Sequence, residues 1–140
     1  MRFMVIVKAS KESEAGAMPS AQELKEMGKF NDELIKAGVM LAGEGLLESK
    51  KGSRIIFKGD KRTVVDGPFA ETKELVAGFW IVQMKSREEC IEWFKRAPCF
   101  ADGELEIRQI AEEADFGEAG KQAHEVFEAE QKLRERVQKH

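Results

Sequence analysis

A chain of 140 residues, 42% of them apolar, is long enough to fold as one domain around its own core. Its 23 basic and 26 acidic residues leave a net charge of only −3. Phosphate backbones and anionic membranes attract proteins that carry a surplus or a cluster of positive charge. We therefore expect neither nucleic acid nor a membrane as a partner.

The sequence also lacks the features of exported and membrane-spanning proteins. The apolar run Phe3–Val7 is shorter than the hydrophobic part of a signal peptide, and no stretch is long enough for a transmembrane helix. Two cysteines occur, Cys90 and Cys99, and two thiols without a secretion signal are typical of a reducing compartment. We expect a cytoplasmic protein whose cysteines are small buried side chains.

The start of the chain predicts a strand followed by a helix. The continuous apolar run Phe3–Val7 is typical of a central strand that is covered on both faces. The polar stretch that follows predicts a loop in which Glu12 and Glu14 are exposed. Ser20 with Glu23 has the spacing of a capping box, and Gly38 is well placed to end the helix. The apolar stripe between these limits consists of Leu24, Met27, Phe30, Leu34 and Ile35.

The middle of the chain predicts several extended segments. The first is either extended or irregular, and it contains two glycines around Glu44, which indicate unusual dihedral angles or close backbone contacts. Two short apolar runs joined by a Lys-Gly-Asp-Lys sequence predict a hairpin. In chain order the segments are Val39–Leu47, the hairpin strands Arg54–Phe57 and Thr63–Val65, and the strongly apolar Leu75–Met84.

A second helix and a last strand complete the predicted domain, which we place at residues 1–110. Ser86 and Glu89 repeat the capping-box spacing, Pro98 limits the helix, and Glu104–Ile110 alternates between two faces. The inward side chains of the helix are Cys90, Ile91, Phe94 and Ala97. The order of strand, helix, strands, helix, strand predicts an α+β fold of the ferredoxin-like βαββαβ type, with both helices on one face of the sheet.

This fold leaves the second face of the sheet uncovered. The strands around Phe3–Val7 and Phe79–Val82 are apolar on both faces, and no segment before Ile110 remains to cover the second one. The simplest cover is the same sheet of another copy. We therefore predict a homodimer in which the two sheets face each other.

After Ile110 the composition changes. Residues 111–120 are acidic and contain glycine, which predicts a linker, and residues 121–140 predict an amphipathic C-terminal helix. Its apolar side chains recur at intervals of about three and four residues, too few for a stable isolated coiled coil. We expect the helix to pack on the predicted domain or on a partner subunit.

The most informative stretch is the turn between two apolar strands at Asp66-Gly67-Pro68-Phe69. Asp66 ends a strand, so burial beneath the sheet would raise its pKa and suit it to proton transfer. Alternatively, Asp66 only caps the Gly-Pro turn through backbone N–H groups. Phe69 either fills the core behind the turn or stacks on a ligand.

Charged side chains near this turn are the other candidates. Lys73 could hold an anionic ligand while Glu71 takes or gives a proton; the alternative is a solvated loop with weak ion pairs. Glu106 and Arg108 share a face of the last strand, where they form either an anion-binding pocket or an ion pair at the sheet edge. Glu44 could reach the same pocket.

The sequence from Asp66 to Glu74, followed by Gly78-Phe79, resembles the signature of the DGPF group of YCII-related proteins. Two further segments, Ala37–Leu46 and Glu104–Arg108, resemble parts of the same family, and the likeness extends from Met1 to Ile110. The resemblance implies a ferredoxin-like dimeric α+β barrel of small bacterial proteins whose activity is poorly defined.

Several absences limit the chemistry. YCII-type relatives are associated with a proposed His–Asp pair, but His124 and His140 are the only histidines and lie outside the matched region. No histidine or cysteine pair has the spacing of metal ligands, and there is no phosphate-binding glycine loop. We expect neither a metal nor a cofactor.

Three functions follow as hypotheses. The first is the binding of a small molecule, with an anion as one option, in a barrel pocket. The second is cofactor-free acid–base catalysis, an isomerase or lyase type of reaction with Asp66 as the proton carrier. The third is assembly through the C-terminal helix. The predicted pocket residues are Asp66, Glu44, Phe69, Glu71, Lys73 and Arg108.

Overall fold

The computed structural model describes residues 1–98, 100 and 102–138. It divides into two compact units, Met1–Arg108 and Gln109–His140. Cys99 and His140 lie outside the described residues. In the part of the chain that is described, no helix has the length and apolar character needed to cross a membrane.

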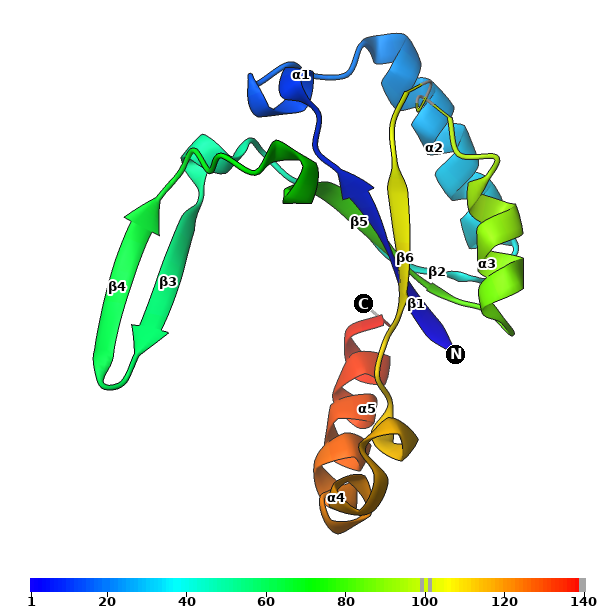
Figure 1. Ribbon diagram of the computed structural model, residues 1–140. Coiled ribbons are helices and arrows are strands. Elements are labelled where there is room, and N and C mark those ends of the chain that lie inside the picture. The colour runs from blue at the N-terminus through cyan, green and yellow to red at the C-terminus, as the bar shows by residue number, and fades with distance from the viewer. Residues whose placement is uncertain (99, 101, 139–140) are drawn as a thin grey trace. The chain divides into compact units, whose positions relative to one another are not determined.

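The larger unit is built on a four-stranded sheet in the order β2-β5-β1-β6 (Figure 1). Its strands are β1 Arg2–Lys8, β2 Met40–Gly45, β5 Val76–Gln83 and β6 Leu105–Gln109. β5 pairs antiparallel with both β1 and β2. Helix α2, Ala21–Lys36, connects β1 to β2, and helix α3, Arg87–Phe94, connects β5 to β6. The predicted ferredoxin-like α+β fold is therefore confirmed.

The core lies between one face of this sheet and the two helices. Phe3 and Val5 of β1 and Trp80 and Val82 of β5 supply the sheet side. From the helices come Phe30, Leu34, Cys90 and Phe94. The rings of Phe30, Trp80 and Phe94 contact one another with centroids 5.1 to 6.1 Å apart. The indole N–H of Trp80 donates to Asn31 Oδ1 at 2.8 Å, so its polar atom is satisfied inside the core.

Helix α2 begins and ends where the sequence predicts. Ser20 and Glu23 form the reciprocal capping box, and Gly38, with φ of 73°, follows the last turn. The predicted apolar stripe was too wide, because Leu24 and Ile35 are exposed. At about 100° per residue, both lie about a quarter of a turn around the helix from Leu34 and a third of a turn or more from Phe30, and these two residues face the core.

The other face of the sheet is also apolar. The cross-strand pairs Met4–Ile81 and Ile6–Phe79 alternate with the core residues, so they point away from the helices. All four side chains are half-buried in the single chain. We call these four residues the open face. Both long helices of the larger unit pack on the opposite side, as predicted (Figure 1).

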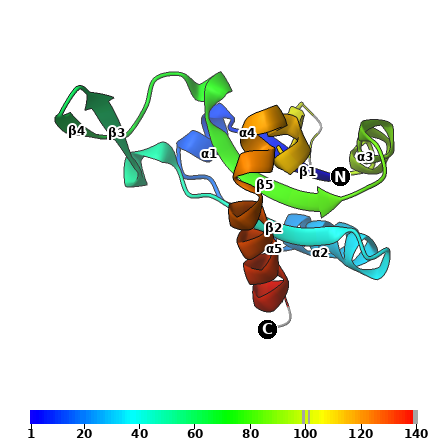
Figure 2. The same cartoon turned by 90° about the horizontal axis from the view of Figure 1, so that it is seen from below.

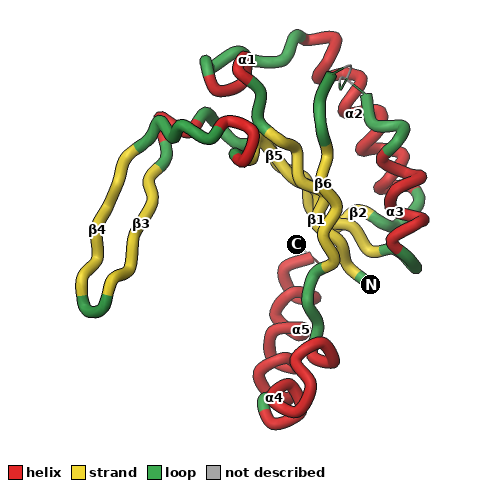
Figure 3. Tube along the Cα trace, viewed as in Figure 1, coloured by secondary structure: helices red, strands yellow, loops and turns green. Residues whose placement is uncertain are grey.

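The predicted hairpin is present but does not belong to the main sheet. Strands β3, Ser53–Lys58, and β4, Lys61–Asp66, pair only with each other in a two-stranded sheet. We call residues 53–66 the arm. The arm extends away from the four-stranded sheet (Figures 1 and 3), and every one of its residues is exposed.

The smaller unit is helical, and it differs from the predicted linker. A 3₁₀ turn at Glu113–Phe116 leads into α4, Gly117–Gln122, and α5, His124–Gln138 (Figure 2). The rings of Phe116 and Phe127 lie 5.4 Å apart, and His124 Nδ1 lies 2.8 Å from Glu113 Oε1. Of the two glycines in this stretch, Gly120 is buried and belongs to a packed turn.

Candidate functional site

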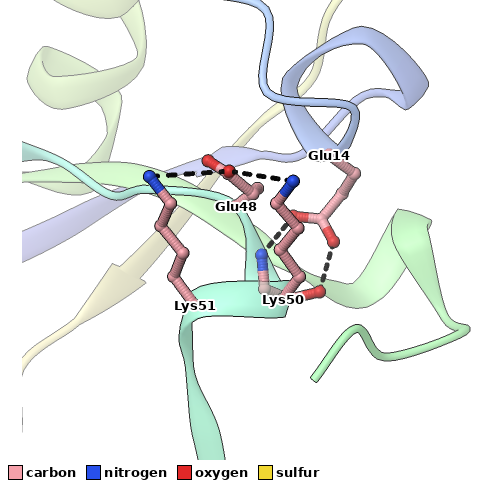
Figure 4. A network of polar contacts seen from close by, with 5 residues as sticks. Glu14, Glu48, Lys50 and Lys51 are labelled. Carbon is pink, nitrogen blue, oxygen red and sulfur yellow. Dashed lines mark hydrogen bonds and ion pairs between the residues drawn. The ribbon is translucent and has the colours of Figure 1, made fainter. Parts of the chain in front are cut away.

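The first element of the candidate site is a short helix that the sequence did not reveal. Helix α1, Lys11–Glu14, is capped by Ser10. The Ser10 hydroxyl oxygen accepts a hydrogen bond from the Ser13 N–H, and the Ser10 N–H donates to the Ser13 hydroxyl oxygen. Glu14, predicted to be exposed in a loop, is half-buried and accepts hydrogen bonds from the backbone N–H and the hydroxyl of Ser49 (Figure 4). The N–H donates to Glu14 Oε2 at 3.0 Å. The exposed-loop prediction was wrong because the partner lies 35 residues away in the chain.

Ser49 then connects α1 to the turn Asp66-Gly67-Pro68-Phe69, which we call the signature turn. Its hydroxyl oxygen accepts a hydrogen bond from the N–H of Phe69 at 3.1 Å, and the N–H of Gly67 donates to the carbonyl of Gly52 at 3.0 Å. A Cβ at Gly67 would lie 1.9 Å from the carbonyl oxygen of Ser49. The glycine is therefore needed where the two backbones meet. The Gly67–Pro68 peptide bond is cis.

Arg54, at the base of the arm, lies over the signature turn. Its guanidinium carbon is 3.8 Å from the centroid of the Phe69 ring, and Nη1 is 3.6 Å from Glu71 Oε2. The Arg54 side chain remains 47% exposed and that of Glu71 60% exposed. The site therefore holds a cation over an aromatic ring, with a loose and solvated counter-ion.

Glu48 is the most enclosed carboxylate of the region. Its side chain is 8% exposed and lies between Lys50 and Lys51, whose Nζ atoms are 3.9 and 3.8 Å from Glu48 Oε1 (Figure 4). Two ammonium groups thus compensate one largely buried charge.

These groups surround an open cavity of about 570 Å³. The greater part of its wall is apolar, and the charged groups are Glu14, Glu48, Lys51 and Arg54. The apolar wall comes from Leu46, Leu47, Phe69, Leu75 and Val76. The cavity has the size and character of a small-molecule site, with mostly apolar walls and a few polar groups.

The structure places the residues of the predicted site in different positions. Phe69 lines the cavity. Glu71 is not part of the cavity wall, but it pairs with Arg54, which is. Lys73 is exposed in the 3₁₀ turn Thr72–Glu74. Asp66 is exposed at the end of β4, where its Oδ1 accepts from the hydroxyl of Ser53 at 2.7 Å. The single chain thus lacks the burial on which the proton-transfer hypothesis for Asp66 depends.

Glu44 and Arg108 do not meet within one chain. Glu44 is on β2 and Arg108 on β6, the two edges of the sheet, with β5 and β1 between them. Three strand spacings separate the edges by roughly 14 Å. Arg108 instead lies 3.4 Å from Glu106, which also pairs with Lys8 at 3.3 Å. The Lys8 ammonium and then Arg108 lower the pKa of Glu106.

Among the residues that line the cavity, only Phe69 was a site candidate from the sequence. The four charged groups and Ser49 were missed: Glu14, Glu48, Ser49, Lys51 and Arg54. The spacing of Ser10 and Ser13 is a local signal that could have revealed α1 and so placed Glu14. No local signal connects Ser49 with Phe69, since that contact depends on how the segments fold together. Among the described residues, no group of three His, Cys, Asp or Glu side chains is placed to hold a metal ion.

Comparisons with known proteins complete the description. An uncharacterized protein of Rhizobium meliloti (strain 1021) is 26% identical over 91 residues, which cover 63% of this chain and 73% of that protein. A similar solved structure is the 5-chloro-2-hydroxyhydroquinone dehydrochlorinase of Burkholderia phenoliruptrix AC1100 in complex with 2,5-dihydroxybenzoquinone. It has a TM-score of 0.45 and 14% identity over 80% of this chain and 95% of its own. The YCII-related domain matches residues 1–114, so the chain belongs to the YCII-related family.

Proposed function

We propose that the protein is a homodimer that binds a small molecule with an apolar body and an anionic group, in the cavity beside the signature turn. The observation that supports this most directly is the position of Arg54. The Arg54 side chain is 47% exposed, and its guanidinium carbon lies over the Phe69 ring at the wall of a mainly apolar cavity. The planar guanidinium presents N–H groups that match the two oxygens of a carboxylate.

The charges of the cavity favour an anion over a cation. Glu14 is already hydrogen-bonded to Ser49, and Glu48 is already paired with two lysines. The Arg54–Glu71 pair is long at 3.6 Å and exposed, so it contributes little stability. A ligand carboxylate can therefore replace Glu71 at Arg54 at small cost, while the apolar walls cover its body.

The dimer part of the proposal is supported by the open face. Met4, Ile6, Phe79 and Ile81 form one contiguous apolar group opposite the helices. Contiguous apolar surface of this kind marks interaction sites in soluble proteins. A second copy of the same sheet would cover it symmetrically. In such a dimer, Glu44, Lys73 and Arg108 stay predicted ligand contacts.

The ligand proposal is tested by titrating the full-length protein with benzoate, followed by calorimetry, with benzyl alcohol as the uncharged probe. Wild type should bind benzoate more tightly than benzyl alcohol. Arg54→Gln should weaken benzoate binding by about 10-fold or more, because one charge-assisted interaction contributes about 1.5–3 kcal/mol. Benzyl alcohol binding should change little.

The matched control is Arg62→Gln. Arg62 is on the same hairpin and also lies over an aromatic ring, Phe57, at 4.7 Å, but it is not part of the cavity wall. Equal effects of the two substitutions, or equal affinity for benzoate and benzyl alcohol, would contradict the proposal.

The catalytic hypothesis for Asp66 remains a prediction for the dimer, in which a second subunit would have to bury that carboxylate. The assembly hypothesis has a specific observation in its favour. Val126, Leu133 and Val137 are spaced seven and four residues apart on one side of α5, and all three are exposed. We propose as a second function that this stripe joins copies of the chain.

A further inference from the structure

The arm exposes large apolar side chains on both of its faces. Cross-strand register places Ile55 opposite Val64 and Phe57 opposite Arg62 on one face. The other face pairs Ile56 with Thr63 and Arg54 with Val65. The exposed fractions are 58% for Ile55, 69% for Phe57 and 64% for Val64, against 51% for Ile56 and 39% for Val65. We call the first, more exposed set, Ile55, Phe57 and Val64, the outer face.

Such an arm is unfavourable in water by itself. A two-stranded hairpin without a further strand or helix to pack on is marginally stable at best, and both strands leave an unpaired edge. The apolar side chains of the outer face gain free energy only when another surface covers them. The composition of the arm therefore indicates a partner.

The base of the arm is firmly held. The Gly67 N–H bonds the Gly52 carbonyl at 3.0 Å, and the Ser53 hydroxyl donates to Asp66 at 2.7 Å. A little further along the chain, the Phe69 N–H donates to Ser49. The first two bonds join the ends of the hairpin to each other. Ser49 is bonded in turn to Glu14 of α1, so the chain at the base of the arm is anchored to the larger unit.

Charge favours another copy of this chain as the partner. The arm has four basic and two acidic residues, whereas the whole chain carries −3, so the rest of the chain is distinctly negative. Two arms would repel each other, but an arm and the body of a second copy attract. In a symmetric dimer each arm–body contact occurs twice, so one exposed apolar face on the chain buries twice its area in the assembly.

We propose that the arm of each subunit packs its outer face on the body of the second subunit, adding to the contact made by the open face. This inference rests on the dimer proposed above. It assigns to Ile55, Phe57 and Val64 an interface role that neither the fold nor the cavity explains. The other face remains with Arg54 on the side of the cavity.

The test is the dimer dissociation constant of full-length variants, measured by sedimentation over a concentration series. The double variant Ile55→Ser, Phe57→Ser should raise the constant by at least 10-fold. The matched control, Ile56→Ser with Val65→Ser on the opposite face, should change it less than 3-fold. Both variants should keep the far-ultraviolet circular dichroism of wild type, because all four side chains are exposed.

A second measurement uses the basic residues at the tip. Trypsin cleavage after Lys58, Lys61 or Arg62 should be slowed when the protein concentration is raised above the dissociation constant, and the outer-face variant should lose this protection. A dimer of unchanged affinity in that variant, or a tip cleaved equally fast in monomer and dimer, overturns the arm contact while leaving the dimer intact. That result assigns the outer face to another occupant, such as a different protein. A wild-type chain that is monomeric throughout overturns the dimer itself.

Discussion

Gly67 is the residue at which a single methyl group should disturb the site most. A Cβ at this position would meet the Ser49 carbonyl oxygen at 1.9 Å and the Lys50 Cα at 3.1 Å, both of them backbone atoms that cannot rotate away. Gly67→Ala should therefore lower the free energy of unfolding by about 1–3 kcal/mol, the usual cost of overpacking. Urea unfolding followed by fluorescence measures this.

Gly45→Ala is the control for that experiment. No atom lies within 4 Å of a Cβ at Gly45, so the substitution should change the unfolding free energy by less than about 0.5 kcal/mol. Equal destabilisation by the two variants would show that the close approach at Gly67 does not hold in solution.

His124 should give the smaller unit a pH dependence. The hydrogen bond with Glu113, followed by its charge, raises the pKa of His124 above the ordinary value of 6.5. Because the folded pKa is raised, the interaction contributes fully below the unfolded pKa and is lost as pH rises through the folded pKa. NMR titration of the ring should give a pKa above 6.5, and Glu113→Gln should return it toward that value. An unshifted pKa in wild type would contradict the Glu113 contact.

For single residues, local sequence patterns identified the ends of helices but not hydrogen-bond partners that are distant in the chain. Ser20, Glu23 and Gly38 were predictable because each acts within one turn of its own position. Glu14 was not, because it bonds a residue 35 positions away. Phe69 lines the cavity, and its contact with a ligand stays a prediction.

Helix α5 exposes a stripe of apolar side chains, Val126, Leu133 and Val137. We expect Leu133→Ser with Val137→Ser to lower the assembled mass in solution, because these side chains supply the exposed stripe. Gln131→Ser with Glu135→Ser, on the opposite side of the same helix, should leave the mass unchanged. Mass photometry compares them directly; identical masses for all three proteins would remove the assembly role.

The apolar pattern predicted β1, β5, β6 and both long helices, because burial of one or two faces leaves a clear pattern. It left the segment that holds β2 as either extended or irregular. It could not show that β3 and β4 stand apart. A hairpin that awaits a partner has the same apolar alternation as one inside a sheet. It also read Ala111–Gly120 as a linker, although the backbone there coils into a 3₁₀ turn and α4. A Cβ at Gly120 would come within 2.3 Å of the Glu113 carbonyl oxygen, so the glycine serves tight packing rather than flexibility.

At the level of the whole molecule, a charge placed on the open face should disrupt the proposed dimer. Ile6→Glu places a charge beside Phe79, its cross-strand partner. A dimer built on this face should dissociate about 100-fold more readily or worse, because an unpaired carboxylate would be buried there. Sedimentation measures the change. Val76→Glu, at an exposed position of β5, is the control and should have little effect. Unchanged affinity for Ile6→Glu would show that the sheets do not face each other.

The position of Arg54 has a thermodynamic consequence. This residue belongs to β3, whose outer side we propose as a contact with a second subunit, and its own side chain lines the cavity. A molecule that binds more tightly to the paired subunits than to the single one must strengthen their pairing by the same factor, since the two equilibria form a closed cycle. Dilution would then release the ligand, and saturation with ligand would hold the subunits together.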